Sequence, residues 1–135
     1  MKETLKFLED HRPFYLATID GPQARVRPLG FVMEYEGRIY FGVGNQKDVY
    51  RQMKANPQVE ISATNSGRPD SPWLRLTGRI IFDDRPELWA ATLKNTPRLA
   101  DLYPETGSAR FTAFYLQEAE AIFYDIKGMV RRVKI

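Results

Sequence analysis

The stretch ARVRPLGF, residues 24–31, holds the first group of side chains that could bind a charged molecule. In an extended strand Arg25 and Arg27 lie on one face, because successive side chains alternate sides. Pro28 has no backbone N–H, so strand pairing is expected to be interrupted there, at an edge or a bulge. Two cations beside an interrupted ladder could bind an anion. The alternative is that both arginines are solvated or paired with surface carboxylates.

A second group lies in the glycine-rich stretch GVGNQKD, residues 42–48. Asn45 is a good helix N-cap and would place Lys47 in the first helical turn, where a cation is disfavoured unless an anion neutralises it. Gly42 and Gly44 would let the backbone approach a ligand, and a helix N-terminus offers free N–H donors. The stretch matches neither GxxxxGK[ST] nor GxGxxG, so a glycine-rich turn with a solvated lysine is the alternative. Pairing of the arginine strand with the next strand would bring Arg27 near this turn.

Several other kinds of chemistry are not indicated. The chain has no cysteine and one histidine, which excludes disulfides, thiolate metal sites and multi-histidine metal sites. His11 is expected as a surface or capping residue at the end of the first helix. Asp83 and Asp84 are expected to cap a later helix, and no nucleophile with a nearby base stands out.

The elements that position these groups follow from hydrophobic periodicity and turn residues. Helices are expected up to residue 12, after residue 44 as far as residue 56, and over residues 84–94. Gly78 is expected to form a bend or bulge. Strands are expected over residues 14–20, 24–35, 38–43, 59–64, 74–82, 111–116, 121–126 and 129–135. Six or more strands joined mostly by hairpins predict a closed or partly closed antiparallel barrel.

Length and composition limit the class of protein. A chain of 135 residues with 43% hydrophobic residues is the size of one globular domain. Its net charge of +3 is compatible with a small anionic ligand but is too low to argue for nucleic acid. The N-terminal stretch MKETLKFLED lacks the apolar region of a signal peptide, and no run approaches the ~18 apolar residues of a membrane span. We therefore expect a cytoplasmic protein without membrane contact.

Taken together, four segments resemble one known family: RVRPLG, the strand YFGVG after a tight turn, the helix opening NQK and the helix exit NPQVEIS. The chain resembles the pyridoxamine 5'-phosphate oxidase-like, FMN-binding split-barrel superfamily, in its small branch of Nim-type and general-stress-type flavoproteins. The similarity covers roughly residues 14–82. It implies a mainly β protein with flanking helices, an antiparallel split β-barrel of the FMN-binding type, with residues 1–135 as a single domain.

The resemblance also implies a cofactor site. Arg27 and Lys47 would hold the phosphate of FMN, backbone near Pro28 and along residues 41–43 would line the flavin ring and ribityl chain, and Trp73 would contribute from a later strand. The cofactor would lie between two subunits of a homodimer. The residues so assigned to the cofactor are Arg27, Pro28, Leu29, Phe41, Gly42, Val43, Lys47 and Trp73.

Three function classes remain open at this point. The leading one is an FMN-dependent oxidoreductase that reduces a small-molecule acceptor. The second is a non-catalytic flavin or haem binder, such as a redox sensor, on the same fold. The third is a nucleic-acid-binding barrel with stacking and phosphate contacts from Arg25, Arg27, Tyr35, Tyr40 and Phe41. The oxidases end in a tryptophan and arginine segment, whereas this chain ends IKGMVRRVKI, and Trp73 stands where they carry glutamine. Pyridoxamine 5'-phosphate is therefore not expected as a substrate.

Overall fold

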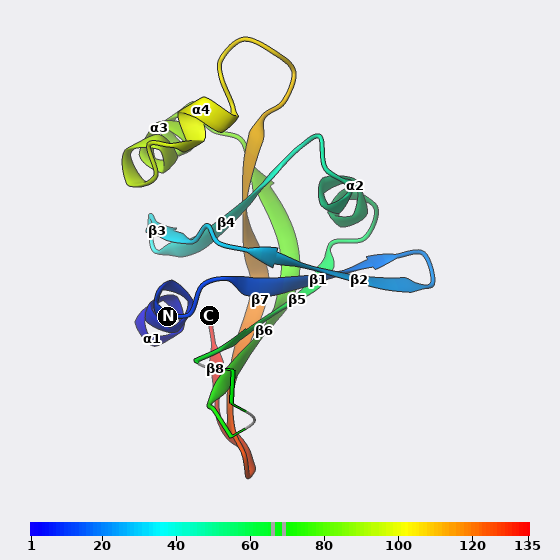
Figure 1. Cartoon of the computed structure of the whole chain (residues 1–135), viewed down its shortest axis with the longest axis vertical. Coiled ribbons are helices and arrows are strands. Elements are labelled where there is room, and N and C mark those ends of the chain that lie inside the picture. The colour runs from blue at the N-terminus through cyan, green and yellow to red at the C-terminus, as the bar shows by residue number, and fades with distance from the viewer. Residues whose placement is uncertain (66, 69) are drawn as a thin grey trace.

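The computed structural model describes residues 1–65, 67–68 and 70–135, and this part of the chain contains eight strands and four helices (Figure 1). The helices are α1 (Lys2–Asp10), α2 (Asp48–Ala55), α3 (Pro86–Asn95) and α4 (Leu99–Leu102). The strands are β1 (Phe14–Asp20), β2 (Gln23–Leu29), β3 (Met33–Tyr35), β4 (Arg38–Gly44), β5 (Gln58–Thr64), β6 (Trp73–Asp83), β7 (Phe111–Asp125) and β8 (Gly128–Lys134).

The strands form one antiparallel sheet in the order β2-β1-β5-β6-β7-β4-β3, and β8 pairs with β7 beyond the end of β4. The long strands β6 and β7 curve through the length of the molecule, with α3 and α4 near one end and the β7–β8 hairpin at the other (Figure 1). The end strands β2 and β3 do not pair with each other in the described residues, so the barrel is open along one side. The predicted antiparallel split barrel is confirmed.

Alternating side chains build the core of this barrel. On β1 the inward residues are Phe14, Leu16 and Thr18, and β5 contributes Ile61, all at most 1% exposed. Fully burying a leucine or isoleucine side chain contributes roughly 1.5–3 kcal/mol. Helices α1 and α2 add further apolar side chains, among them Leu8 at 0% exposure. The strands predicted over residues 14–20 and 59–64 are therefore confirmed.

The prediction of one strand over residues 24–35 is wrong. β2 ends at Leu29 and β3 begins at Met33, with residues 30–32 outside both strands. β2 pairs with β1, whereas β4 pairs with β3 and with β7. β2 is an edge strand, so no further strand pairs with its outer side in the described residues. Pro28 lacks a backbone N–H and is therefore tolerated in this strand, as expected for a proline at a sheet edge.

The two strands predicted over residues 111–116 and 121–126 are one continuous strand, β7. Near its middle Glu118 has a left-handed backbone, with φ at 54°, and the β6–β7 register shifts between Thr77 and Arg79. The bulge predicted at Gly78 therefore lies at this irregularity, and an added Cβ at Gly78 would press on Leu116. Before the bend β7 pairs with β4, and after it β7 pairs with β8, so the sequence break reflects a change of neighbour.

The helix predictions are correct in position, and His11 is the C-cap residue of α1 as expected, but the N-caps predicted for α2 and α3 are wrong. α3 begins at Pro86 with Arg85 as its N-cap residue, and no side chain caps it. Asp83 instead accepts hydrogen bonds from Arg85 and from Tyr40, so it fastens α3 to β4. The short helix α4 was not predicted. No helix within the described residues is long and apolar enough to cross a bilayer.

Candidate functional site

The side chain of Arg27 joins the three elements β2, β1 and α2. Its Nη2 donates to Oε1 of Gln52 at 2.6 Å, and its Nη1 donates to Oγ1 of Thr18 at 2.7 Å. Nη1 also lies 3.2 Å from the carbonyl oxygen of Leu16. Thr18 Oγ1 in turn donates to Gln52 Oε1 at 2.6 Å. We call these three side chains, Arg27, Thr18 and Gln52, the arginine node.

The arginine node places a positive charge among neutral oxygens. Within the described residues no carboxylate lies at ion-pair distance from Arg27, and its Nε–H has no acceptor. Burial, and to a smaller degree the neighbouring charge of Arg25, lowers the pKa of the Arg27 guanidinium. Arg25 itself pairs with Asp20, with 3.3 Å between Nε and Oδ2. The two arginines of the strand therefore differ: Arg25 has a counter-charge and Arg27 lacks one.

The β1–β2 register explains why Arg27 points inward. Arg27 lies opposite the core residue Leu16, so its side chain is on the core face next to Thr18. Thr18 and Gln52 are 1% and 4% exposed, and buried polar side chains require hydrogen-bond partners. The sequence analysis missed both residues. The available signal was a polar residue at an inward position of an otherwise apolar row.

Lys47 is the N-cap residue of α2, so the prediction that Asn45 caps this helix is wrong. Asn45 is held elsewhere, because its N–H donates to the Arg110 carbonyl at 2.8 Å and its Oδ1 accepts from the Arg110 N–H at 2.9 Å. The helix opens with Asp48, whose charge suits the positive end of the helix dipole. No side chain caps the first N–H groups of α2, and among the described residues the exposed Lys47 has no acidic partner.

The glycines of β4 make room for neighbouring side chains. A Cβ added at Gly42 would overlap the ring of Phe111, and one at Gly44 would overlap Gln46 and the Tyr103 hydroxyl. Packing of the Phe111 ring is therefore enough to require glycine at position 42. The side chains of Phe41 and Val43 are in the core, at 1% and 5% exposure. This leaves backbone as the part of residues 41–43 that could contact a cofactor.

Pro28 and Leu29 form the free end of β2. Pro28 is exposed and Leu29 is half-buried against the core. The next residue, Gly30, has open space around it, because an added Cβ would meet nothing within 4 Å. The chain is thus open to solvent around Pro28 and Gly30, just after Arg27 on the strand.

Trp73 lies far from the arginine node within one chain. β1 and β5 stand between β2 and β6, so three strand spacings separate them, about 14 Å at roughly 4.8 Å each. Trp73 stacks on Tyr124 with ring centroids 4.1 Å apart, and Arg75 covers both rings at 5.3 and 5.2 Å. Arg75 also pairs with Glu60 at 2.6 Å. The structure therefore brings Trp73 and Arg75 together but does not bring them to Arg27.

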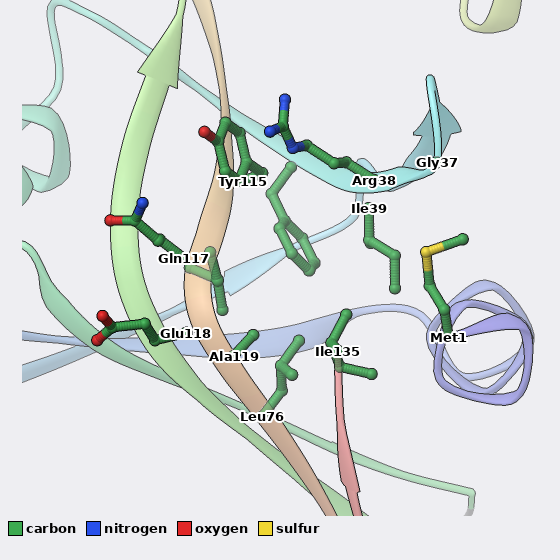
Figure 2. A pocket seen from close by; sticks show the side chains of 12 residues that line it. Met1, Gly37, Arg38, Ile39, Leu76, Tyr115, Gln117, Glu118, Ala119 and Ile135 are labelled. Carbon is green, nitrogen blue, oxygen red and sulfur yellow. The ribbon is translucent and has the colours of Figure 1, made fainter.

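The described part of the chain has two cavities outside the arginine node. One, of about 290 Å³, lies between β4, the bend of β7 and both chain ends; Figure 2 shows Arg38 reaching toward Tyr115 beside it, while Gln117 and Glu118 point away. The other, of about 420 Å³, lies between α3, the segment that follows α4, and the adjoining ends of β6 and β7. No group of acidic, histidine or cysteine side chains that could hold a metal ion occurs in the described part of the chain.

Comparison with protein families identifies the chain. The family model described as pyridoxamine 5'-phosphate oxidase matches residues 1–98. The chain belongs to the pyridoxamine 5'-phosphate oxidase family. Among solved structures, a NimC/NimA family protein from Clostridium acetobutylicum has 38% identity and a TM-score of 0.87, covering 100% of this chain and 93% of its own. The resemblance inferred from the four motifs is thus confirmed at the level of the family and its small Nim-type branch.

More distant structures share the fold. A pyridoxamine 5'-phosphate oxidase-related, FMN-binding protein from Nostoc punctiforme has 15% identity and a TM-score of 0.61, covering 93% of this chain and 79% of its own. A haem-binding protein from Mycobacterium smegmatis has 17% identity and a TM-score of 0.69, covering 98% of this chain and 56% of its own. A search of curated proteins gave no match. Proteins of this fold therefore include one described as FMN-binding and one described as haem-binding.

Proposed function

We propose that the chain is an FMN-binding flavoprotein that acts as an oxidoreductase on a small-molecule acceptor. One observation carries this proposal: the half-buried Arg27 donates only to neutral oxygens, so its charge is not compensated. A phosphate monoester supplies both the missing charge and strong acceptor oxygens. The family and the FMN-binding Nostoc relative support FMN as the phosphate carrier.

The chain's own residues would bind and orient the cofactor. Arg27 and Lys47 would hold the phosphate, together with the uncapped N–H groups at the start of α2. Backbone at Pro28 and Leu29 and along residues 41–43 would line the ribityl chain and the ring. Bound FMN supplies the electron-transfer chemistry, and the protein supplies position and electrostatics.

Flavin reconstitution tests the proposal. We expect the purified chain to take up FMN stoichiometrically and to bind riboflavin at least about tenfold more weakly, because riboflavin lacks the phosphate. Reduction of the bound flavin by NAD(P)H, followed by reoxidation with an added acceptor, would establish the oxidoreductase activity. No uptake of flavin, or equal uptake of the two flavins, would contradict the phosphate site.

Haem is the alternative ligand, because the Mycobacterium smegmatis relative binds it. The single histidine, His11, is the C-cap residue of α1, and its Nδ1 lies 2.7 Å from the Phe7 carbonyl oxygen. The absorption spectrum of the reconstituted chain distinguishes the two ligands. Bound flavin absorbs in the near ultraviolet and in the blue and has no Soret band, whereas bound haem gives a Soret band. A Soret band with one equivalent of haem and no flavin uptake would favour this alternative.

We further propose a homodimer with the cofactor at the subunit interface. The outer face of the sheet exposes Tyr15 (47%), Ile19 (40%) and Val26 (68%) on β1 and β2. At the other end of the same face, Trp73 and Tyr124 stack beside the exposed Met129. A two-fold axis between these two apolar regions would set each one against the other region of a second copy.

The same dimer would bring Trp73 of one copy close to Arg27 of the other, although the two residues are far apart within one chain. Across a two-fold axis, Trp73 would face the β1–β2 edge of the second copy, where Pro28 lies. Val32 and Met33 add little to such an interface, since they are only 2% and 4% exposed within one chain. Light scattering that gives 15.6 kDa with flavin bound would contradict the dimer.

We propose neither nucleic acid as a partner nor pyridoxamine 5'-phosphate as a substrate. Tyr40 and Phe41 are 0% and 1% exposed, so they are not available to stack on nucleic-acid bases. Near the chain end, Arg131 pairs with Glu3 and lies over Phe123, and Arg132 pairs with Glu120. These arginines are used in surface contacts, so we expect no turnover of pyridoxamine 5'-phosphate; measurable aldehyde production would contradict this.

A further inference from the structure

The cavity of about 420 Å³ between α3 and β7 has the size of a small-molecule site, since ligand pockets occupy roughly 300–1,000 Å³. It lies at the end of β6 opposite Trp73 and is separate from the arginine node. Leu88 at 1% exposure and Ala113 at 5% contribute its apolar floor. The function proposed above makes no use of this cavity.

Three aromatic side chains form the walls. The ring of Phe111 lies 5.9 Å from that of Trp89 and 5.6 Å from that of Tyr103, between centroids. A further ring, Phe31, supports Phe111 from outside the cavity at 5.1 Å. Aromatic rings at such separations favour offset or edge-to-face contact with another ring. The walls are therefore suited to a flat aromatic molecule.

The walls are also fixed in place. Phe111 occupies the space over Gly42, and the Tyr103 hydroxyl lies over Gly44, so both rings rest directly on the backbone of β4. Thr92 at the side of the cavity is fully buried, and its hydroxyl donates to the Leu88 carbonyl at 2.8 Å. A cavity whose walls are already held needs little reorganisation to bind a ligand.

The charges around the cavity decide the sign of its ligand. Arg85 is bound to Asp83, and Arg110 donates to backbone carbonyls of its own loop, including that of Ala109 at 3.0 Å. The carboxylates of Asp84 and Glu105, by contrast, are exposed and have no cationic partner among the described residues. An anionic ligand would therefore meet two unpaired carboxylates, Asp84 and Glu105, against one arginine, Arg110, that has no carboxylate partner among the described residues.

We propose that this cavity binds a planar aromatic molecule that carries no negative charge. The volume and the charge of the cavity do not depend on bound flavin, so this proposal can be tested independently of the phosphate site. Its wall, through Phe111, touches the β4 backbone that is assigned to the cofactor, which would place the ligand one ring away from that strand.

Tryptophan fluorescence tests the proposal directly, because the chain has only two tryptophans. In the full-length variant Trp73→Phe, only Trp89 in the cavity wall remains. We expect 1,4-naphthoquinone to quench it saturably. In Trp89→Phe, only Trp73 on the outer sheet face remains, and quenching should rise linearly without saturation. The absence of cysteine excludes addition of the quinone to a thiol. Linear quenching in both variants would overturn the proposal.

A second pair of variants tests the wall and the charge. Tyr103→Ala should weaken naphthoquinone binding about three- to tenfold, whereas its neighbour Leu102→Ala, exposed at 64%, should change it by less than about 1.5-fold. The anionic 1,4-naphthoquinone-2-sulfonate should bind at least about fivefold more weakly than the neutral quinone. Equal binding of the two quinones would overturn the charge assignment. If Tyr103→Ala does not fold, the comparison of the two tryptophan variants still decides.

Discussion

Two arginines, Arg27 and Arg85, each connect a helix to strands of the sheet, and they differ in the groups to which they donate hydrogen bonds. Arg85 joins β6 and α3 to the β3–β4 turn: its Nε lies 3.0 Å from Oδ1 of Asp83, and its Nη1 lies 3.3 Å from Glu36. These hydrogen bonds, first of all those to Asp83, raise the pKa of Arg85 above its usual range. Arg27 joins β2, β1 and α2 through neutral oxygens alone, and burial lowers its pKa.

The contrast separates a structural cation from one that is ready for a ligand. The carboxylates of Asp83 and Glu36 already neutralise the charge of Arg85 within the fold, at 3.0 and 3.3 Å from its nitrogens. Burying a charge without a counter-charge costs free energy, and a fold that tolerates this at Arg27 recovers the cost when an anion binds. Removing Arg85 should therefore affect stability, and removing Arg27 should affect binding.

The largest expected effect is on cofactor binding at Arg27. We expect Arg27→Ala to weaken FMN about 10- to 150-fold, because a charge-assisted hydrogen bond contributes roughly 1.5–3 kcal/mol. Titration of flavin fluorescence measures this, and riboflavin affinity should hardly change. Arg85→Ala is the matched control, expected to lower the unfolding temperature while leaving FMN affinity within about twofold. An FMN affinity that falls equally in both variants would remove the distinction between the two arginines.

The next effect concerns stability at the other junction. Asp83→Asn should cost about 1.5–3 kcal/mol of unfolding free energy at neutral pH, because it removes the carboxylate that Arg85 and Tyr40 bind. The Arg85 side chain lowers the pKa of Asp83 below its usual 3.8. A lowered carboxyl pKa contributes stability above the unfolded pKa and loses it as the pH falls through the folded one.

The difference between the wild type and Asp83→Asn should accordingly be full well above the usual carboxyl pKa of 3.8 and should shrink as the pH falls from there through the lowered pKa of folded Asp83. Urea unfolding at a series of pH values measures it. A difference that persists unchanged in acid would show that the loss comes from packing and not from the ion pair.

How far the sequence predicts this contrast depends on the distance along the chain between the partners. β1 is predicted to the residue because its alternation is local, and the importance of Arg27 follows from the adjacent Pro28. Thr18 and Gln52, which complete the arginine node, are 34 residues apart, and only the fold brings them together. The break between β2 and β3 was likewise missed, because its cause is the separate partners of the two strands, β1 and β4.

Lys47 should have a smaller effect than Arg27. It is exposed at the start of α2 and has no fixed position in a hydrogen-bond network among the described residues, so water and salt screen its charge. We expect Lys47→Ala to weaken FMN about three- to tenfold in low salt, with the effect shrinking as ionic strength rises. Lys54→Ala, at the other end of the same helix, is the control. A loss as large as that of Arg27→Ala, and insensitive to salt, would show that Lys47 binds the phosphate as directly as Arg27 does.

The smallest effect is expected for Arg25, two residues before Arg27 on the same strand. Its side chain is 52% exposed and pairs with Asp20, and exposed pairs of this kind contribute about 0–1 kcal/mol. Two opposing consequences of Arg25→Ala also offset each other: the FMN phosphate loses a distant attraction, while Arg27 loses a neighbouring like charge that lowers its pKa. FMN affinity should therefore change by less than about fivefold, as measured in the same fluorescence titration.

An effect of Arg25→Ala larger than that of Arg27→Ala would move the anion site outward to the tip of the β1–β2 hairpin, where Arg51 also lies near Asp20. The neutral surroundings of Arg27 would then reflect packing alone, and the contrast with Arg85 would no longer distinguish a binding cation from a structural one.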